Sequence, residues 1–375
     1  MMRSLKNIAG PLSVGNGKIT FTRLQLLEGK AYGFSIMSIS HKGLKFVLIT
    51  GMLLISLLTQ AQQRQFEYVL PFFGFADNRE YTNTVHPPQT IFGARISPEA
   101  GFLLDSAHRL RVGLHLTKEF GSEENTYLHN PIMYYQYVKP KVDFYMGFFP
   151  RTGILDQYPL PLLSDTLRYF RPNVEGIYLK LKVGKGYQTA WIDWTSRQTD
   201  TNRETFLTGT SGRQTIGNLF FDNYFLLYHY AISGEPSPDD NIRDNAGLML
   251  RLGIDLSKKT FFDSLSLSVA WLGSFDRLRD VYDWRTPSGF QYGFFIQKKS
   301  FYCNTYLYTG DGQSLAYGDS FYKAPVYGRA DSGYEFIKQR AVQVRFVFSL
   351  HYIEEKLDNQ QLLTVLISTD NLQKK

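Results

Sequence analysis

The sequence predicts an all-β fold, a transmembrane antiparallel barrel of roughly 14–16 strands with 16 the best value. Three observations lead to this prediction. Apolar and polar residues alternate with a period of two down most of the chain, so each strand has one apolar and one polar face. Aromatic residues make up 15% of the 375 residues, which suits the aromatic girdles of membrane barrels. A short apolar segment precedes the alternating region, where an export signal would lie.

This apolar segment is Phe46–Leu58, which is too short for a membrane-spanning helix of about 20 residues. Basic residues precede it and Thr59-Gln60-Ala61 follows it, in the pattern of a secretory signal peptide. We expect residues 37–61 to be a signal peptide that is cleaved near Ala61, and residues 1–36 to be a mis-assigned or cleaved extension. The alternative is a signal-anchor helix with a cytoplasmic tail. Residues 62–375 are then the barrel.

The charge of the chain lies mostly in this leader. The formal net charge is +7, from 41 basic and 34 acidic residues. Residues 1–61 hold seven basic residues and one acidic residue, so the predicted barrel, with 34 basic and 33 acidic residues, has a net charge of about +1. This balance gives no reason to expect a nucleic-acid partner. The single cysteine, Cys303, excludes an intrachain disulfide and a cysteine-based metal site.

Fifteen segments have the composition and period of strands. The clearest is 109–119, where Arg, Gly, His and Thr alternate with Leu and Val. The predicted strands are 66–75, 90–104, 109–119, 132–138, 142–149, 177–183, 187–195, 206–216, 224–233, 246–256, 265–272, 290–296, 301–309, 342–352 and 362–367. Because both ends of such a barrel lie in the periplasm, the count should be even. We expect the missing strand in 313–326.

The connections between these strands alternate between short and long. Short ones fall at 105–108, 139–140, 184–186, 258–263 and 299–300, and long polar ones at 76–89, 120–130, 150–174, 197–205, 234–244, 276–288 and 310–325. Short periplasmic turns and long outer loops are typical of bacterial barrels. The alternative fold is a soluble secreted β-protein, but its polar face would carry fewer glycines beside its charges.

If the apolar face meets lipid, the polar face lines a lumen. The lumen candidates are Arg95, Glu99, Arg109, Arg111, Glu119, Lys141, Asp143, Lys180, Lys182, Asp193, Arg251, Asp255 and Arg345. Rings of such charges set the selectivity of channels, and their basic excess favours anionic solutes. The alternative is that they pair across neighbouring strands and fill the lumen.

The stretch 150–174 is the predicted constriction of this lumen. It is rich in proline and contains the apolar run Leu160–Leu163, which is unusual for a free outer loop. A loop with an apolar anchor of its own can fold inward and narrow a pore. The constriction candidates are its charged residues, Arg151, Asp156, Asp165, Arg168 and Arg171. The alternative is a loop that packs over the barrel mouth or contacts a partner.

Four short stretches carry a resemblance to a known group of proteins. They are Thr59–Gln63 at the expected cleavage site, Met146–Arg151, Tyr327–Asp331 and the closing hairpin His351–Gln361. In these stretches and in its overall pattern, the chain resembles the porin-like outer-membrane barrels of Bacteroidota. The resemblance implies a barrel in a Gram-negative outer membrane and passage of solutes, but it names no substrate.

From these features we expect a porin-like channel for diffusion of small polar solutes, anionic ones among them. The alternative is a closed outer-membrane barrel with a structural or surface-binding role. Common hydrolase and nucleotide-binding motifs are absent, and His229 and His351 both face inward by alternation, so we expect no enzyme. We expect no cofactor and no metal. The expected partners are outer-membrane lipid, small polar solutes and two further copies of the chain in a trimer.

Overall fold

The structure is a computed structural model that describes residues 13–15, 18–27, 30–40, 65–122, 128–235 and 240–368. The chain divides into two compact units between Arg64 and Gln65. In the first unit, β1 (Ser13–Gly15), β2 (Lys18–Leu27) and β3 (Lys30–Ser40) form a three-stranded antiparallel sheet. The cleavage site expected near Ala61 lies outside the described residues.

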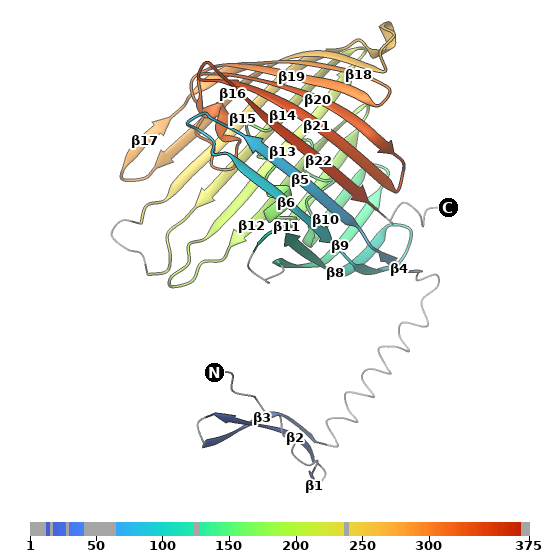
Figure 1. Ribbon diagram of the computed structural model, residues 1–375, viewed down its shortest axis with the longest axis vertical. Coiled ribbons are helices and arrows are strands. Elements are labelled where there is room, and N and C mark those ends of the chain that lie inside the picture. The colour runs from blue at the N-terminus through green and yellow to red at the C-terminus, as the bar shows by residue number, and fades with distance from the viewer. Residues whose placement is uncertain are drawn as a thin grey trace. The chain divides into compact units, whose positions relative to one another are not determined.

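The second unit is a closed barrel of antiparallel strands, which run obliquely around its wall (Figure 1). Its wall segments are β4 (Gln65–Val69), β5 (Phe72–Glu80), β6 (Gln89–Ile96), β7 (Glu99–Leu103), β8 (His108–Glu119), β9 (Leu128–Lys139), β10 (Val142–Pro150), β11 (Asn173–Val183), β12 (Gly186–Ser196), β13 (Thr205–Ile216), β14 (Leu219–Tyr230), β15 (Arg243–Asp255), β16 (Ser264–Leu278), β17 (Tyr282–Arg285), β18 (Ser288–Lys298), β19 (Phe301–Gly310), β20 (Val326–Lys338), β21 (Val342–Ile353) and β22 (Lys356–Ile367). Strand β22 pairs with β5 and closes the barrel.

These segments make sixteen wall strands, as the sequence predicted. Three pairs of consecutive segments, β4 with β5, β6 with β7 and β17 with β18, each continue as one strand. Each of the fifteen predicted segments overlaps a wall strand. The missing strand is β20, and its predicted place in 313–326 is wrong, since that stretch instead contains the short 3₁₀ helix η2 (Ser320–Lys323).

The two ends of the barrel differ in their connections. At the end where β4 begins and β22 stops, which we call the terminal end, tight turns lie at 140–141, 184–185, 217–218 and 299–300. Gly184, Gly217 and Lys299 have φ angles of 58°, 61° and 51°, as two-residue hairpin turns require. The opposite end, the loop end, carries long connections at 151–172, 231–242 and 311–325. The predicted asymmetry is therefore confirmed, with the short turns at 279–281 and 354–355 as exceptions.

Two of the long loops, residues 151–172 and residues 311–325, fold into the lumen. We call these two loops together the plug. The first contains the single-turn helix α2 (Leu167–Phe170) and the second contains η2. The loops bind each other, since the Ser164 N–H donates to the Tyr317 carbonyl at 2.7 Å and the Asp319 N–H to the Leu160 carbonyl at 2.9 Å. Their apolar side chains pack on inward-facing wall residues such as Trp191, Leu207, Met249 and Leu272. This packing is the main apolar core of the barrel.

The outward face of the wall is apolar. Its exposed residues include Met133, Val183, Leu252 and Leu307, and such a face suits the lipid that surrounds a membrane barrel. None of the described helices has the length and hydrophobicity to cross a membrane.

The plug reverses the usual pattern where it touches the wall. In β14 the buried, inward residues are Tyr224 and Leu226, so His229 lies on the outward face, with its ring centroid 5.0 Å from that of Phe206. The prediction that His229 faces inward is wrong. An apolar plug needs apolar wall residues against it, so hydrophobicity alone does not identify the lipid face there. His351 faces inward as predicted and is fully buried.

Candidate functional site

Most of the predicted lumen charges lie inside the barrel and form ion pairs there. The pairs are Arg109 with Glu67 at 2.8 Å, Arg111 with Glu99 at 3.4 Å, Lys182 with Asp143 at 2.8 Å, Arg251 with Asp222 at 3.5 Å and Arg151 with Asp193. Lys180 lies over the Tyr187 ring at 4.3 Å. Pairing of this kind satisfies buried charges.

Three of the predicted lumen residues lie elsewhere. Glu119 and Asp255 are exposed at the ends of their strands. Lys141 is exposed in the turn between β9 and β10, so its placement on a strand face is wrong. Arg95 and Arg345 do face the lumen, and they line a cavity described below.

The predicted constriction residues are all in the first plug loop or at its edges. Arg168 pairs with Asp165 at 3.0 Å, and the Asp156 carboxylate accepts from the Gly153 N–H at 2.7 Å. The Arg171 carbonyl accepts from Arg151 Nε at 3.1 Å. The apolar run that suggested an inward fold is buried at Leu162 and Leu163.

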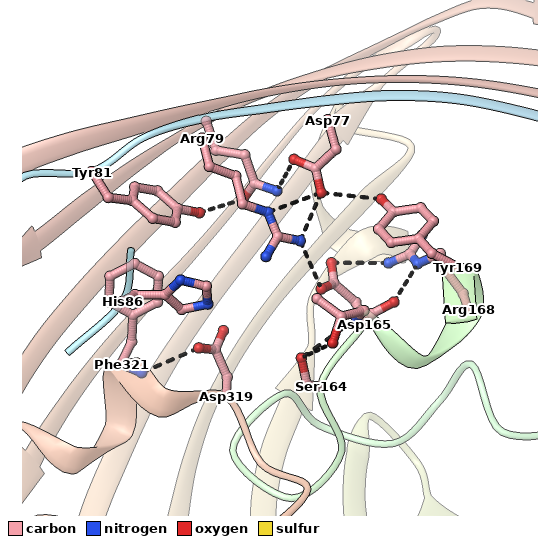
Figure 2. A network of polar contacts seen from close by, with 12 residues as sticks. Asp77, Arg79, Tyr81, His86, Ser164, Asp165, Arg168, Tyr169, Asp319 and Phe321 are labelled. Carbon is pink, nitrogen blue, oxygen red and sulfur yellow. Dashed lines mark hydrogen bonds and ion pairs between the residues drawn. The ribbon is translucent and has the colours of Figure 1, made fainter. Parts of the chain in front are cut away.

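A polar network fastens this loop to the wall (Figure 2). The Arg79 guanidinium donates to Asp77 at 2.7 Å and lies 3.9 Å from Asp165 of the plug. The Tyr169 hydroxyl of α2 donates to Asp77 at 3.2 Å, and Gln360 of β22 donates to the same carboxylate at 2.5 Å. Asp77 therefore joins the first wall strand, the last wall strand and the plug.

The pKa values of two plug carboxyls in this region are shifted in opposite directions. Burial alone would raise the pKa of Asp165, but the guanidinium groups of Arg168, Arg329 and Arg79 hold that pKa below its ordinary value. Burial raises the pKa of Asp319 despite the nearby Arg329. Asp319 also accepts from the Phe321 N–H at 3.1 Å (Figure 2) and so caps η2.

Beside the plug lies a cavity of about 630 Å³, within the size range of small-molecule sites. It reaches toward the terminal end, because residues 340–341 and Ser368 help to line it. One part of its wall is apolar, with Phe72, Phe73, Leu155, Leu160, Leu163 and Leu366, and another part carries Arg95, Ser97, His115, Arg151, Arg168 and Arg345. The carboxylates of Glu99, Asp156 and Asp165 also line it.

An interruption in the wall places Ser97 at this cavity. Pro98 has no N–H for the ladder, so the strand breaks between β6 and β7. The Ser97 N–H donates to the Pro71 carbonyl at 2.9 Å, and the Leu114 N–H donates to the Pro98 carbonyl at 3.2 Å. Opposite the break, a Cβ on Gly113 would lie 2.4 Å from the Pro98 oxygen, so only glycine fits there.

The side chains of Ser97, His115 and Asn173 form a hydrogen-bonded chain. Ser97 Oγ lies 2.6 Å from His115 Nδ1, and His115 Nε2 lies 2.9 Å from Asn173 Oδ1. Asn173 Nδ2 donates to the Pro131 carbonyl at 2.6 Å, which directs Oδ1 toward the imidazole. His115 Nε2 then carries the ring proton, and Nδ1 is free to accept from the Ser97 hydroxyl. This is the arrangement of nucleophile, base and orienting group.

A buried ion pair supports the far end of this chain. Arg151 Nη2 donates to the Asn173 carbonyl at 3.0 Å and also pairs with Asp193. Asp193 is fully buried and accepts from the Glu175 N–H at 2.9 Å. Arg151 at the start of the plug loop, backed by Asp193 of β12, thus holds the backbone of Asn173, and Asn173 fixes the imidazole of His115.

Ser97, His115 and Asn173 are not among the site residues predicted from the sequence. Ser97 and His115 could have been found, because the hairpin predicted around 105–108 pairs positions near 97 with positions near 115, on one face. Asn173 follows the long plug loop, and no local pattern fixes where such a loop returns. No cluster of three or more His, Cys, Asp or Glu residues that could hold a metal occurs among the described residues.

Comparison with solved structures supports the fold. The barrel is similar to OmpT, an outer membrane protein of Vibrio cholerae, in a loop-deletion mutant (TM-score 0.51, 9% identity, 82% of this chain and 100% of that one) and in a trimer form (TM-score 0.51, 8% identity, the same coverage). OprB of Pseudomonas putida matches with a TM-score of 0.49 and 10% identity over 85% of this chain and 97% of that one. The two OmpT matches show that the fold is that of outer-membrane barrels.

Comparison of sequences adds the family. No curated protein sequence matches the chain. The sequence profile of the lipid A 3'-O-deacylase-type family matches residues 58–368, which is most of the chain. That family is one of enzymes, so our prediction of no enzyme is wrong. The prediction relied on linear motifs, and the Ser97, His115 and Asn173 chain comes from three separate strands. The chain belongs to the lipid A 3'-O-deacylase-type family.

Proposed function

We propose that the protein is an outer-membrane hydrolase that removes an acyl chain from an ester, the kind of activity its family name states. The observation that carries this proposal is the hydrogen-bonded chain of Ser97, His115 and Asn173 at the wall of the lumen cavity. Ester cleavage needs an activated hydroxyl, a base within hydrogen-bond reach and a group that orients the base. These three side chains meet that need.

Each residue has one role in the proposed reaction. Ser97 Oγ attacks the ester carbonyl while His115 Nδ1 takes its proton, and the new Oγ–C bond gives a tetrahedral intermediate. The C–O bond to the alcohol breaks as His115 returns the proton to the leaving oxygen. Water then attacks the acyl-serine with His115 as base again, which releases the fatty acid and restores Ser97. Asn173 accepts from His115 Nε2 throughout and keeps the imidazole in the reactive tautomer.

The cavity wall suits an acyl substrate. The side chains of Phe72, Leu155, Leu160 and Leu366 line it close to the polar group that holds Ser97. An apolar chain gains free energy from burial against such a surface, at about 25 cal/mol per Å². The polar residues can then act on the carbonyl at one end of the chain.

The test uses the full-length protein refolded in detergent micelles and a soluble aryl ester. We expect Ser97→Ala and His115→Asn to lower kcat/KM by at least about a hundredfold, the scale of general base and nucleophile loss. The matched controls are Ser349→Ala and His351→Asn, which alter a buried serine and a buried histidine of the wall outside the cavity. A fluorophosphonate should label Ser97 covalently, as seen by mass spectrometry of the digested protein.

Full activity in Ser97→Ala, or fluorophosphonate labelling at another residue, would show that Ser97 is not the nucleophile. Activity lost equally in the two control variants would indicate general damage to the barrel. Folding of each variant is checked by its heat-modifiable mobility in gel electrophoresis.

A second candidate function is a channel for small polar solutes, anionic ones among them. The charges along the inner wall favour it, and Arg95 and Arg345, with which no described carboxylate pairs, line the cavity. The plug opposes it, since its side chains pack on the wall across the lumen. Recording in planar bilayers separates the two: stable conductance steps in the wild type would support a channel, and steps that appear only after deletion of 155–165 would support a plugged barrel.

A further inference from the structure

Arg95 is a buried cation without an anionic partner. Its side chain is 5% exposed, and none of the described carboxylates forms an ion pair with it. Its one hydrogen bond to a described residue runs from Nη1 to the Arg168 carbonyl at 2.8 Å, and its guanidinium lies 5.1 Å from the centre of the Phe73 ring. A guanidinium has five N–H donors, so most of those of Arg95 are unused. A charge buried in this way is costly unless something pairs with it.

Other guanidinium groups face the same cavity. Arg151 Nη1 is buried and has no hydrogen-bond partner among the described residues. Arg345 of β21 also lines the cavity, and no described carboxylate pairs with it. By contrast, the wall arginines Arg111, Arg213 and Arg251 lie against carboxylates. Arg95, Arg151 and Arg345 thus bring donors without a partner among the described residues to the cavity that holds Ser97.

The position of Arg95 relates these donors to the reacting group. Arg95 and Ser97 lie two residues apart on the same face of one wall strand, a spacing of roughly 7 Å along the strand. Thr117 lies directly across from Arg95 on β8, and His115 is two residues further along the same face. An anion held by Arg95 would therefore sit within the length of one small molecule from Ser97.

We propose that the lumen cavity binds a phosphate group, with Arg95 as its main ligand and with Arg151 Nη1 and Arg345 as further donors. The ligand class is a phosphate monoester dianion, because several planar donors line the one cavity and each phosphate oxygen can accept from more than one of them. The proposal rests on the proposed hydrolase in one respect: the phosphate would belong to the ester substrate. Arg95 would then determine substrate specificity by binding this phosphate.

The first experiment measures binding alone. Full-length protein in micelles is dialysed to equilibrium against radiolabelled inorganic phosphate, at constant ionic strength set with chloride. We expect one bound phosphate per chain, and a loss of affinity of at least about tenfold in Arg95→Met, since a charge-assisted contact is removed. Arg95→Lys keeps the charge and a donor for the Arg168 carbonyl, so it should retain part of the phosphate affinity. This variant also tests whether loosening of α2 explains the loss of affinity in Arg95→Met.

The matched control is Arg213→Met. Arg213 is a wall arginine paired with Asp222 at 2.6 Å and lies outside the cavity lining, so its loss should leave phosphate binding unchanged. Acetate in place of phosphate tests a carboxylate ligand. Absence of phosphate binding in the wild type, equal binding in Arg95→Met, or an equal loss in Arg213→Met would each overturn the proposal, as would acetate binding as tight as phosphate.

The second experiment separates the sources of the phosphate. Two acyl esters that differ only in one phosphate are compared as substrates. A wild-type preference for the phosphorylated one, abolished in Arg95→Met, supports a substrate headgroup as ligand. Equal turnover of both, with Arg95-dependent binding of inorganic phosphate, supports free phosphate as ligand. Phosphate binding by Ser97→Ala should equal that of the wild type, and if that variant still hydrolyses esters, the proposed hydrolase fails while the phosphate site stands.

Discussion

The packing of the plug against the wall gives a prediction with a defined sign and size. Leu162 is fully buried in the plug. A Cβ added to Gly247 of β15 would lie 2.5 Å from Leu162 Cδ2 and 3.0 Å from both Leu315 Cδ atoms, well inside the ordinary contact distance of about 3.5–4.0 Å. The two loops therefore share a small space that Gly247 leaves open.

Leu162→Ala should lower the free energy of unfolding by about 3 kcal/mol, as for other fully buried leucines. Gly247→Ala should lower it by about 1 kcal/mol, because overpacking exceeds the gain from a less flexible backbone. In the double variant the new methyl group enters space that Leu162 has vacated. We expect the double variant to lose about 3 kcal/mol, so the two changes should be coupled by about 1 kcal/mol.

Unfolding in urea, followed by tryptophan fluorescence in lipid vesicles, measures these values. Trp191 is a suitable reporter, because its Nε1 donates to the Tyr158 hydroxyl of the plug at 2.8 Å. The control pair is Leu252→Ala with Gly247→Ala, since Leu252 is on the same strand and faces outward. Additivity of Leu162→Ala and Gly247→Ala within about 0.5 kcal/mol would refute the inward packing of the plug.

Two further predictions concern the pH dependence of the plug. The pKa of Asp165 lies below its ordinary value of 3.8, so its carboxylate stabilises the plug above pH 3.8. This stabilisation is lost as the pH falls through the lower pKa of the folded state. Asp165→Asn should abolish this acid transition, which is measured by the protease sensitivity of residues 151–172 between neutral pH and strong acid. The pKa of Asp319 lies above 3.8, so its contribution to the stability of the plug is complete below pH 3.8 and is lost as the pH rises through the pKa of the folded state. Asp319→Asn can still accept from the Phe321 N–H, so this variant should match the stability of the wild type in acid and exceed it at neutral pH. A variant that is less stable at both pH values would contradict this assignment.

Local patterns predicted most of the wall, because the period of two is a property of each strand by itself. The strand around 109–119 needs no distant contact to show one apolar and one polar face. β20 was not predicted because Gly328, Gly333 and the charged residues Arg329 and Asp331 interrupt its alternation. Its pairing with β19 and β21 compensates for that. Strand pairing across the sheet therefore decides a segment that its own sequence leaves open.

The candidate site was hidden for a different reason. Its base and its orienting group are 58 residues apart, and the plug loop lies between them in the chain. The rule that apolar residues face lipid also fails where the plug packs on the wall. Leu207 and Met249, for example, face inward and their side chains are fully buried. A sequence can indicate that a loop is apolar enough to fold inward, but the wall residues that receive it depend on the closed barrel.

Asp77 also has a consequence for the order in which the barrel assembles. It sits on the first wall strand, and its partner Gln360 on the last is 283 residues away in sequence. Asp358 of the last strand likewise accepts from the Thr82 N–H at 2.8 Å. Contacts between such distant residues carry the largest loop-closure entropy, so this side-chain seam forms late. Since Asp77 also holds Tyr169 of the plug, the final step of closure joins the two ends of the wall and sets the plug in its place at once.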